Sequence, residues 1–518
     1  MVRKNDGMGS SRRALCGAAL FFLGSCLAGC SSSTQPLQAP ATAPVTLTIG
    51  YPHITGVDPL HGLQQAARLI TFEGLVSLSR EGRPQPRLAE SWSQSADGLE
   101  WTIRLRPNAK FHDGSPADAL AIKASLERSV ASPERDMSPG LADIVRIDAL
   151  SEYELLIRLR ARSTFLLDNL TVPIIKVGEN REQLGTGPFV TTSTGASEVV
   201  LNAVTFYYRG QPKIDRIVIK AYPAVRAAWA AMMRGDVDFL YEVGPEAVEF
   251  MRGESTINIF PFLRSYAIGV ILNSRRKEFA DSRIKRAMNH AINRELMVDQ
   301  SLRGHGIAAS GSVWPQHWAF DPNLPPFTYD VAKASALLDS AGVTERRMSN
   351  GQSARFRFTC LFPENFALWE RLGLHVQRNL AEVGIDMQLE TLPVDEFNRR
   401  IGEADFDAVL TEFVVGNSPS RPYFFWHSQS SRNVWGYASA GMDQALDGMR
   451  RATTEAEYRQ AFRQFQVENM ENPPAIFLLL GETTRAVSKR FEVVAPAGSD
   501  ILPTIGDWRP ATAARFSN

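Results

Sequence analysis

Regular alternation of hydrophobic and polar positions predicts a strand and then a helix early in the chain. In residues 99–106 (LEWTIRLR) every second side chain is apolar, which is typical of a strand with one buried face. Apolar side chains then recur at every fourth position over Ile122–Val130, which predicts a helix. Ser115 is the expected N-cap of this helix, with Pro116 at its first position.

The segment between these two elements contains the adjacent pair His112–Asp113, a combination found in catalytic and metal-binding sites. Gly114 follows the pair and gives the backbone the freedom that a tight turn needs. Because a predicted strand ends just before the pair and a predicted helix begins just after it, we interpret His112–Asp113 as part of a strand-to-helix turn.

Helical and strand patterns alternate through the second half of the chain. Asp330 is a predicted N-cap, Thr454 and Glu457 form a predicted capping box, and Gly342 and Gly384 end two predicted helices. Helices are predicted in residues 282–297, 329–342, 372–384 and 454–470, and strands in residues 385–392, 406–415 and 473–480. Interleaved helices and strands indicate α/β domains whose sheets are covered on both faces.

The length and composition are those of a soluble globular protein. A chain of 518 residues is long enough for about two or three domains, and 44% hydrophobic and 22% charged residues are ordinary values. Lys plus Arg and Asp plus Glu both number 56. No excess charge therefore attracts the chain to nucleic acid or to an anionic membrane surface.

The N-terminal residues predict export and lipid attachment. Basic residues precede an apolar run, Ala14–Cys30, that is shorter than the roughly 20 residues of a membrane span. The run ends in Leu-Ala-Gly-Cys, which resembles the bacterial lipobox, so residues 1–30 are the expected lipoprotein signal peptide and Cys30 the expected lipid attachment site. Residues 31–44, rich in Ser, Pro and Ala, are the expected tether. An ordinary cleaved signal is the alternative.

Cysteine usage agrees with a fold that needs no covalent cross-link. Once the signal is removed and Cys30 is lipid-modified, Cys360 is the only other cysteine, so no internal disulfide is expected. The export route stays open, because Ser11–Leu15 only half-matches a twin-arginine signal.

Motifs for catalysis are missing from the sequence. The chain has no G-x-x-x-x-G-K-[ST] phosphate loop and no G-x-S-x-G nucleophile motif, and its histidines never fall into close metal-ligand spacing. Gly304-x-Gly306 fits a loose dinucleotide pattern but follows a helix-like segment rather than a strand. We therefore expect neither an enzyme nor a cofactor or metal, and an exported hydrolase is the least favoured hypothesis.

Several longer segments, taken in order, carry a resemblance to one family. They are residues 84–130, GTGPFV (185–190), KIDRIVIKAYP (213–223), MMRGDVDFL (232–240), ILNSRRKEFADSRIKRAMNHAINRELMV (271–298), YDVAKASALLDSAGV (329–343) and FDAVL (406–410). In these segments the chain resembles the family 5 extracellular solute-binding proteins of ABC importers, the oligopeptide, dipeptide and nickel type. The resemblance extends from about Val45 to Pro510.

The resemblance implies an α/β, two-lobed periplasmic-binding-protein-like fold of type II, with an extra insert domain. Lobe I would comprise residues 45–83, 185–270 and 481–518, the insert residues 84–184, and lobe II residues 271–480. Gly185 and Gly187 would then lie where the chain re-enters lobe I rather than in a phosphate-binding loop.

In peptide-binding relatives an aspartate after the Phe-Asp strand holds the α-amino group of the ligand. Aligning Phe406–Asp407 with that strand places Phe413 at the family's tryptophan, and Gly416 or Val415 at the aspartate position. Neither residue can pair with an ammonium group, and a buried cation without a counter-charge is costly. Glu412 would substitute only if it faced the ligand, but strand alternation puts it opposite Phe413.

Other candidate ligand-binding residues surround this position. Arg421 offers a planar guanidinium for a carboxylate or phosphate, and an ordinary solvated arginine is the alternative. The aromatic run 423–426 is expected to be half core and half pocket wall. The candidate ligand-binding residues are Ile54, Thr55, Tyr241, Tyr266, Phe413, Val415, Gly416, Asn417, Arg421 and Trp426.

The resemblance implies a lipid-anchored receptor in the periplasm or cell envelope that binds a peptide or small organic solute between two closing lobes. It would act as a monomer and deliver its ligand to ABC permease subunits, with separate ATPase subunits supplying the energy. The alternative is a surface protein that senses a solute or handles peptides without transport. No nucleic-acid partner is expected.

Overall fold

The computed structural model describes residues 43–52, 59–132, 138–347, 351, 353–364 and 366–512. From Pro44 onward the chain forms one compact unit. The predicted signal peptide with Cys30, most of the predicted tether, and the candidate residues Ile54 and Thr55 lie outside the described residues.

Within the described residues, eleven strands form one mixed sheet in the order β10-β11-β12-β1-β13-β21-β14-β20-β18-β19, with β15 paired to β21. The strands are β1 Thr46–Pro52, β10 Phe189–Thr194, β11 Glu198–Ala203, β12 Arg216–Tyr222, β13 Phe239–Val243, β14 Ile257–Leu272, β15 Gly306–Ala308, β18 Phe356–Pro363, β19 Ile385–Leu392, β20 Ala408–Val414 and β21 Ala475–Ser488. β1 runs parallel to β12 and β13, and β18 runs parallel to β19 and β20. We call the part around β1 the first half of the sheet and the part around β18 the second half.

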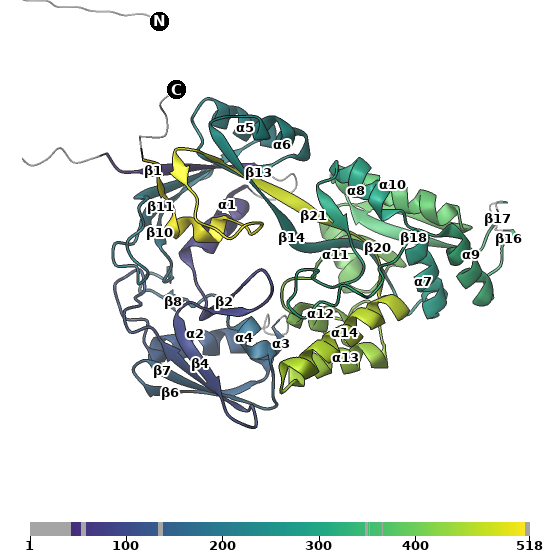
Figure 1. Cartoon of the computed structure of the whole chain (residues 1–518), viewed down its shortest axis with the longest axis horizontal. Coiled ribbons are helices and arrows are strands. Elements are labelled where there is room, and N and C mark those ends of the chain that lie inside the picture. Colours follow the sequence, from purple (N-terminus) through teal and green to yellow (C-terminus); the bar gives the residue numbers. More distant parts are fainter. Residues whose placement is uncertain are drawn as a thin grey trace, which may run out of the picture. The chain divides into compact units, whose positions relative to one another are not determined.

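Two long strands, β14 and β21, join the two halves (Figure 1). β14 has 16 residues and β21 has 14, and they pair antiparallel along nearly their whole length. β13 flanks β21 in the first half, and β20 flanks β14 in the second half. The register of the pair shifts between Leu263 and Ala267, close to where β20 begins to pair. The halves therefore share two strands whose pairing is irregular near the middle.

Helices cover both faces of each half, as the interleaved sequence pattern predicts. In the first half, α1 and η3 pack on one face and α5 and α6 on the other. In the second half, α7, α9 and α10 share one apolar cluster, and α11 to α14 share another. The helices are α1 Pro59–Thr71, α5 Val225–Met233, α6 Pro245–Arg252, η2 Lys277–Phe279, α7 Ser282–His290, α8 Arg294–Leu302, α9 Val331–Ser340, α10 Ala367–Ala381, α11 Val394–Gly402, α12 Ser420–Trp426, α13 Ala440–Arg451, α14 Glu455–Glu471 and η3 Leu502–Asp507.

Most of the residues between α1 and β10 form a smaller layer with its own apolar cluster. Its sheet has the order β4-β5-β7-β6. The elements are β2 Val76–Leu78, β3 Pro84–Pro86, β4 Ala89–Gln94, β5 Glu100–Leu105, α2 Ala119–Ala131, α3 Pro139–Ala142, β6 Ile144–Ser151, β7 Glu154–Leu159, α4 Phe165–Asn169, β8 Lys176–Val177 and β9 Gln183–Leu184. Two further hairpins pair β16 Arg346–Arg347 with β17 Ser353–Ala354, and β22 Phe491–Glu492 with β23 Arg509–Pro510. The division into two lobes and an insert at the residues given above stays a prediction.

Local signals place several element ends correctly, but two predictions are wrong. The single helix predicted over residues 282–297 is two helices, α7 and α8, because the chain leaves the helix after His290 and Asn293 caps a new one. Asp330 and Thr454 cap their helices as predicted, each accepting a backbone N–H three residues ahead. The predicted cap Ser115 is wrong, because α2 begins at Ala119 and the Asp118 carboxylate accepts the Ala121 N–H at 2.9 Å. Ser115 instead donates its N–H and hydroxyl to the Asp113 carboxylate, which holds it in the preceding turn.

His112–Asp113 lies in a turn, as predicted, and its side chains have structural partners. His112 Nδ1 accepts the Gly185 N–H at 3.2 Å, and Nε2 lies 3.2 Å from the Gly187 carbonyl oxygen. Burial lowers the pKa of His112 to about 4, so the ring is neutral and donates from Nε2. Asp113 pairs with Lys176 at 2.6 Å. The pair therefore fastens this turn to the segment that leads into β10.

Gly185 and Gly187 lie directly against the end of α1. A Cβ at these positions would come within 2.3 Å of the Thr71 carbonyl oxygen and 2.5 Å of the Ile70 carbonyl oxygen, respectively. The Gly187 N–H also donates to Thr71 O at 3.0 Å. Close backbone packing explains why both positions need glycine.

Candidate ligand-binding site

The predicted residues Tyr266, Val415 and Gly416 come together where β14 meets the end of β20. Tyr266 lies opposite Val414 in the ladder. The N–H groups of Val415 and Gly416 both donate to the Ser265 carbonyl oxygen, at 3.1 and 3.0 Å. Gly416 has a φ of +55°, so the backbone turns directly after the end of β20. Tyr266 is exposed beside this turn.

Arg421 joins this group from the first turn of α12. A Cβ built at Gly416 would lie 3.7 Å from Arg421 Cγ, so the side chain passes directly over the glycine. Arg421 is half-buried. Burial lowers the pKa of its guanidinium, and the Tyr266 hydroxyl acts in the opposite direction. Tyr266, Gly416 and Arg421 therefore form one polar patch, which we call the β20 patch.

Glu412 is already engaged and supplies no free carboxylate to the β20 patch. Its two oxygens accept from Arg264 Nη1 and Nη2 at 3.0 and 3.2 Å, which is a bidentate pair. The Arg264 guanidinium lies 5.3 Å from the centre of the Tyr266 ring. Glu412 points away from Phe413, as strand alternation predicts, and its charge is balanced by Arg264.

Phe413, Val415 and Trp426 lie beneath the β20 patch in the core of the second half. Their exposed fractions are 2%, 1% and 0%. The Phe413 ring packs edge-on against Trp426, with centroids 5.8 Å apart. These side chains therefore support the end of β20 and the start of α12 from below and present no surface to a ligand in this arrangement.

Tyr241 belongs to a second cluster, in the first half of the sheet. Its ring lies 4.6 Å from the Tyr51 ring and 4.0 Å from the Arg485 guanidinium, which also pairs with Asp500 at 2.7 Å. The pKa of Tyr51 is raised to about 12, mainly by burial and to a smaller extent by the neighbouring Tyr241. Arg485, on the shared strand β21, also faces Phe262 at 5.2 Å. Nothing in the sequence around Arg485 marks it, because its partners come from distant segments.

Asn417 links the β20 patch to a different part of the chain. Its side-chain amide donates to the Ser79 carbonyl oxygen at 2.7 Å. The next residue, Ser418, donates its hydroxyl to the Asp168 carboxylate of α4, whose pKa burial raises to about 7. The sequence offered no signal for Asp168, because the contact depends on how α4 packs against α12.

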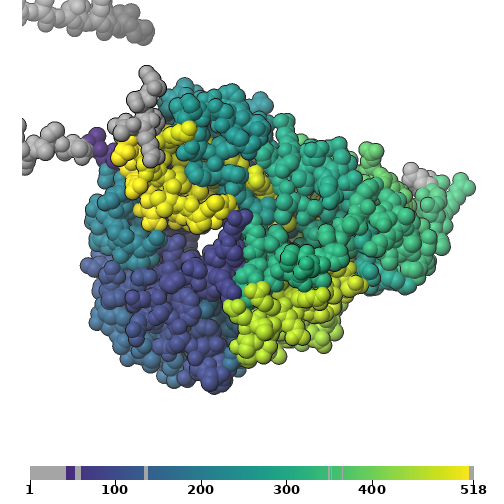
Figure 2. All heavy atoms as spheres, viewed as in Figure 1, coloured from purple at the N-terminus to yellow at the C-terminus, as the bar shows by residue number. Residues whose placement is uncertain are grey.

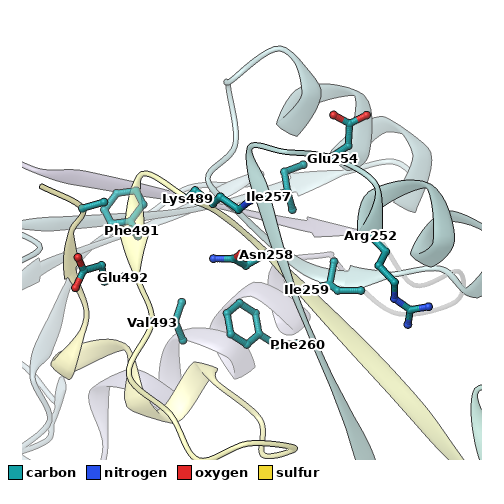
Figure 3. Close-up of a pocket in the computed structure, with 11 residues that line it drawn as sticks. Arg252, Glu254, Ile257, Asn258, Ile259, Phe260, Lys489, Phe491, Glu492 and Val493 are labelled. Atoms are coloured by element: carbon teal, nitrogen blue, oxygen red, sulfur yellow. The ribbon is translucent and has the colours of Figure 1, made fainter. Parts of the chain in front are cut away.

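A large groove lies away from the β20 patch, and a small cavity touches the patch at Gly416. A groove of about 900 Å³ lies between the start of β14 and the C-terminal segment, lined by residues such as Asn258, Phe260 and Val493, and by none of the predicted ligand residues (Figure 3). A cavity of about 10 Å³ beside Val415 and Gly416 has room for about one water. Figure 2 shows a separate opening, bordered by the purple, teal and yellow parts of the chain.

Two kinds of feature are absent from the part of the chain that the structure describes. No helix in this part of the chain has the length and hydrophobicity to cross a membrane. No group of three or more His, Cys, Asp or Glu side chains in the same residues is arranged to hold a metal ion.

A model of the bacterial extracellular solute-binding proteins, family 5 (middle part), matches residues 83–436. The chain belongs to this family. The predicted family and the predicted two-lobed fold class are thus confirmed.

Relatives of this family 5 protein cover most of its length at low identity. It is 25% identical over 429 residues to the probable D,D-dipeptide-binding periplasmic protein DdpA of Escherichia coli K12, covering 78% of this chain and 80% of that protein. It is 22% identical over 481 residues to the glutathione-binding protein GsiB of Pectobacterium atrosepticum, covering 88% and 92%. The crystal structure of NikZ from Campylobacter jejuni with Ni(L-His) superposes with a TM-score of 0.74 at 22% identity, covering 90% of this chain and 99% of that one.

Proposed function

We propose that this family 5 protein is the extracytoplasmic solute receptor of an ABC importer. It is anchored by lipid at Cys30, captures a peptide or small organic solute between the two halves of its sheet, and delivers it to a separate permease. The loop after β20 supports this proposal, because two of its consecutive residues contact different parts of the chain. Gly416 is bonded to β14, whereas Asn417 reaches Ser79 outside the second half. A solute bound beside this loop would lie close to both β14 and the segment that contains Ser79.

The shared strands provide a mechanism for capture. β14 and β21 are paired at both ends but shift in register between Leu263 and Ala267. Bending there would move the halves relative to each other while each keeps its own helices. A solute that contacts both halves stabilises their approach, and the permease responds to the population of that state.

The β20 patch suggests how the ligand is oriented. Gly416 cannot neutralise a ligand ammonium, and Glu412 is held by Arg264. Arg421 offers a half-buried guanidinium, which suits a carboxylate of the ligand, with Tyr266 providing an aromatic surface beside it. The ligands named for relatives, a D,D-dipeptide and glutathione, both carry carboxylates and serve as the first probes.

Native mass spectrometry of the chain from Ser31 onward, purified without refolding, tests solute capture. We expect a bound mass that denaturation releases, and we expect Arg421→Ala to lose it. Arg432→Ala, which removes an exposed arginine from the loop after α12, is the matched control and should keep it. If both variants retain the same mass, Arg421 does not hold the ligand. If no mass is found, calorimetry with D-alanyl-D-alanine and with glutathione decides whether the chain binds solutes of this kind.

The lipid anchor and the delivery step need separate measurements. Mass spectrometry of the N-terminal peptide from membranes should show diacylglyceryl on Cys30, and Cys30→Ser should release the protein from the membrane fraction. Uptake of the identified solute should fail in cells that lack the receptor. Normal uptake in such cells would leave binding intact but contradict the role in transport.

A further inference from the structure

The tip of the β2–β3 hairpin, residues Ser79–Arg83, contacts the second half of the sheet through consecutive carbonyl groups. Asn417 Nδ2 donates to Ser79 O at 2.7 Å and Trp314 Nε1 donates to Arg80 O at 2.8 Å. The Trp318 N–H donates to Glu81 O at 3.0 Å. The three donors lie in two separate segments of the second half. Residues more than two hundred positions further along the chain therefore donate hydrogen bonds directly to the hairpin backbone.

Side chains of the same tip add to this contact. The Arg83 guanidinium lies 3.7 Å from the centre of a Trp318 ring and forms an ion pair with Glu455. Arg80 donates to the Gln316 side chain and, at 3.1 Å, to the Ala497 carbonyl oxygen of the C-terminal segment. The tip thus connects the second half to the C-terminal segment that packs with the first half.

Gly82 shows how closely the tip fits. Its φ is +81°, and a Cβ at this position would lie 2.2 Å from the Asn417 carbonyl oxygen and 2.8 Å from His317 Cδ2. Both atoms belong to the second half. A side chain larger than hydrogen therefore cannot be accommodated while the tip and the second half keep this arrangement, although it would meet no such obstacle once they separated.

We propose that residues Ser79–Arg83 form a clasp that holds the second half against the hairpin and must be released for the two halves to move apart. This inference rests on the receptor function proposed above, because it requires the two halves to move apart. Water can satisfy the same carbonyl groups after separation, so each bond contributes only a modest net stabilisation and release stays reversible. The clasp would bias the protein toward its closed arrangement before any solute binds, and a bound solute would add to that bias.

Gly82→Ala tests the clasp, with Gly114→Ala as its matched control. Gly114 has a φ of +82°, almost equal to that of Gly82, but a Cβ there meets nothing within 4 Å. Both variants therefore place an alanine at a similar positive φ, and only Gly82→Ala places an atom in the contact. Spin labels on Gln211→Cys in the first half and Ala381→Cys in the second, both exposed positions, report the separation by pulsed electron resonance.

Without added solute, Gly82→Ala should populate a longer distance than the parent protein. We expect the closed-to-open ratio to fall by about tenfold or more, since a sub-van-der-Waals contact must be relieved. Gly114→Ala should keep the parent distance distribution. Identical distributions in all three proteins would overturn the clasp.

A second variant keeps the test decisive if Gly82→Ala does not fold. Arg83→Ala removes a partly exposed side chain and should shift the distribution in the same direction, whereas Arg83→Lys keeps the charge opposite Glu455 and should shift it less. Gln85→Ala, at an exposed position on β3, is the control. No shift for Arg83→Ala would contradict the proposal.

The same measurement separates the clasp from the receptor function. If D-alanyl-D-alanine, glutathione or the co-purified solute changes the distance but the clasp variants do not, the clasp is wrong and the receptor function stands. If the clasp variants change the distance but no solute does, the clasp is supported and capture by closure is contradicted.

Discussion

Arg294 tests how this fold accommodates a buried cation. Its side chain is 2% exposed at the start of α8. Nε donates to Phe477 O at 2.7 Å, and the two Nη atoms donate to Asn289 O and Asn289 Oδ1 at 2.8 Å and to Ile292 O at 3.3 Å. Burial lowers the pKa of Arg294, and the neighbouring Glu295 carboxylate acts in the opposite direction. The direct hydrogen-bond acceptors of the guanidinium are thus neutral oxygens, and the Phe327 ring faces it at 5.6 Å.

The expected cost of removing these donors follows from the bonds. In Arg294→Met, Asn289 Oδ1 still accepts the Phe477 N–H at 3.2 Å, but the main-chain oxygens of Phe477, Asn289 and Ile292 each lose a donor. At about 1 kcal/mol for each buried acceptor left unsatisfied, the free energy of unfolding should fall by about 3 kcal/mol.

Urea unfolding followed by tryptophan fluorescence measures this loss as a shift of the midpoint. Arg286→Met is the control, because Arg286 on the preceding helix α7 only forms a partly exposed pair with Glu471 at 3.0 Å, worth less than about 1 kcal/mol. Arg294→Lys should lie between the two, since one ammonium cannot reach all four oxygens. If Arg294→Met unfolds at the same urea concentration as Arg286→Met, the oxygens around the guanidinium add no net stability and the reasoning is refuted.

Four further predictions concern pH and packing. The raised pKa of Asp168, about 7, means that the folded state keeps a proton that the unfolded state releases near pH 4, so stability should fall as pH rises between these values. Asp168→Asn should therefore melt above the parent at pH 8 and not at pH 4, and parallel melting curves would contradict this. The lowered pKa of His112, about 4, has the opposite sign: stability should be lost as pH falls from about 6.5 toward 4, and His112→Gln should remove that slope in the same melts. Gly187→Ala should lower the free energy of unfolding by about 1–3 kcal/mol, because its Cβ would lie 2.5 Å from Ile70 O, whereas Gly195→Ala, whose nearest contact would be 3.6 Å, should be tolerated. Phe413→Ala should cost about 3–5 kcal/mol as a core truncation, and normal stability with lost solute binding would show that Phe413 contacts the ligand after all.

Sequence patterns could predict those parts of the fold that depend on neighbouring residues. The helix caps Asp330 and Thr454 and the strand at residues 385–392 follow from spacing alone, and the structure confirms them. Ser115 was predicted wrongly because two acids compete nearby: Asp113 binds Ser115 in the turn, and Asp118 is left to cap the helix. Local preference could not decide between them.

Local sequence patterns predict less of the candidate site than of the fold. Alignment with the family's Phe-Asp strand led to Gly416 and Arg421 as candidates, and the structure places both beside Tyr266. Tyr241, predicted for the same site, lies instead with Tyr51. Contacts such as Asn417 to Ser79 join positions far apart in sequence, and no periodicity or spacing encodes them. The ligand-binding role of these residues stays a prediction.

The position of β21 in the sheet affects the order of folding. This strand lies between β13 and β14 and also pairs with β15, yet it is formed by residues 475–488. A growing polypeptide lacks β21 until nearly all the other strands have been synthesised, so neither half of the sheet is complete before this late segment is made. Neither half can therefore complete its part of the sheet alone during synthesis, and the two halves finish together when β21 is added.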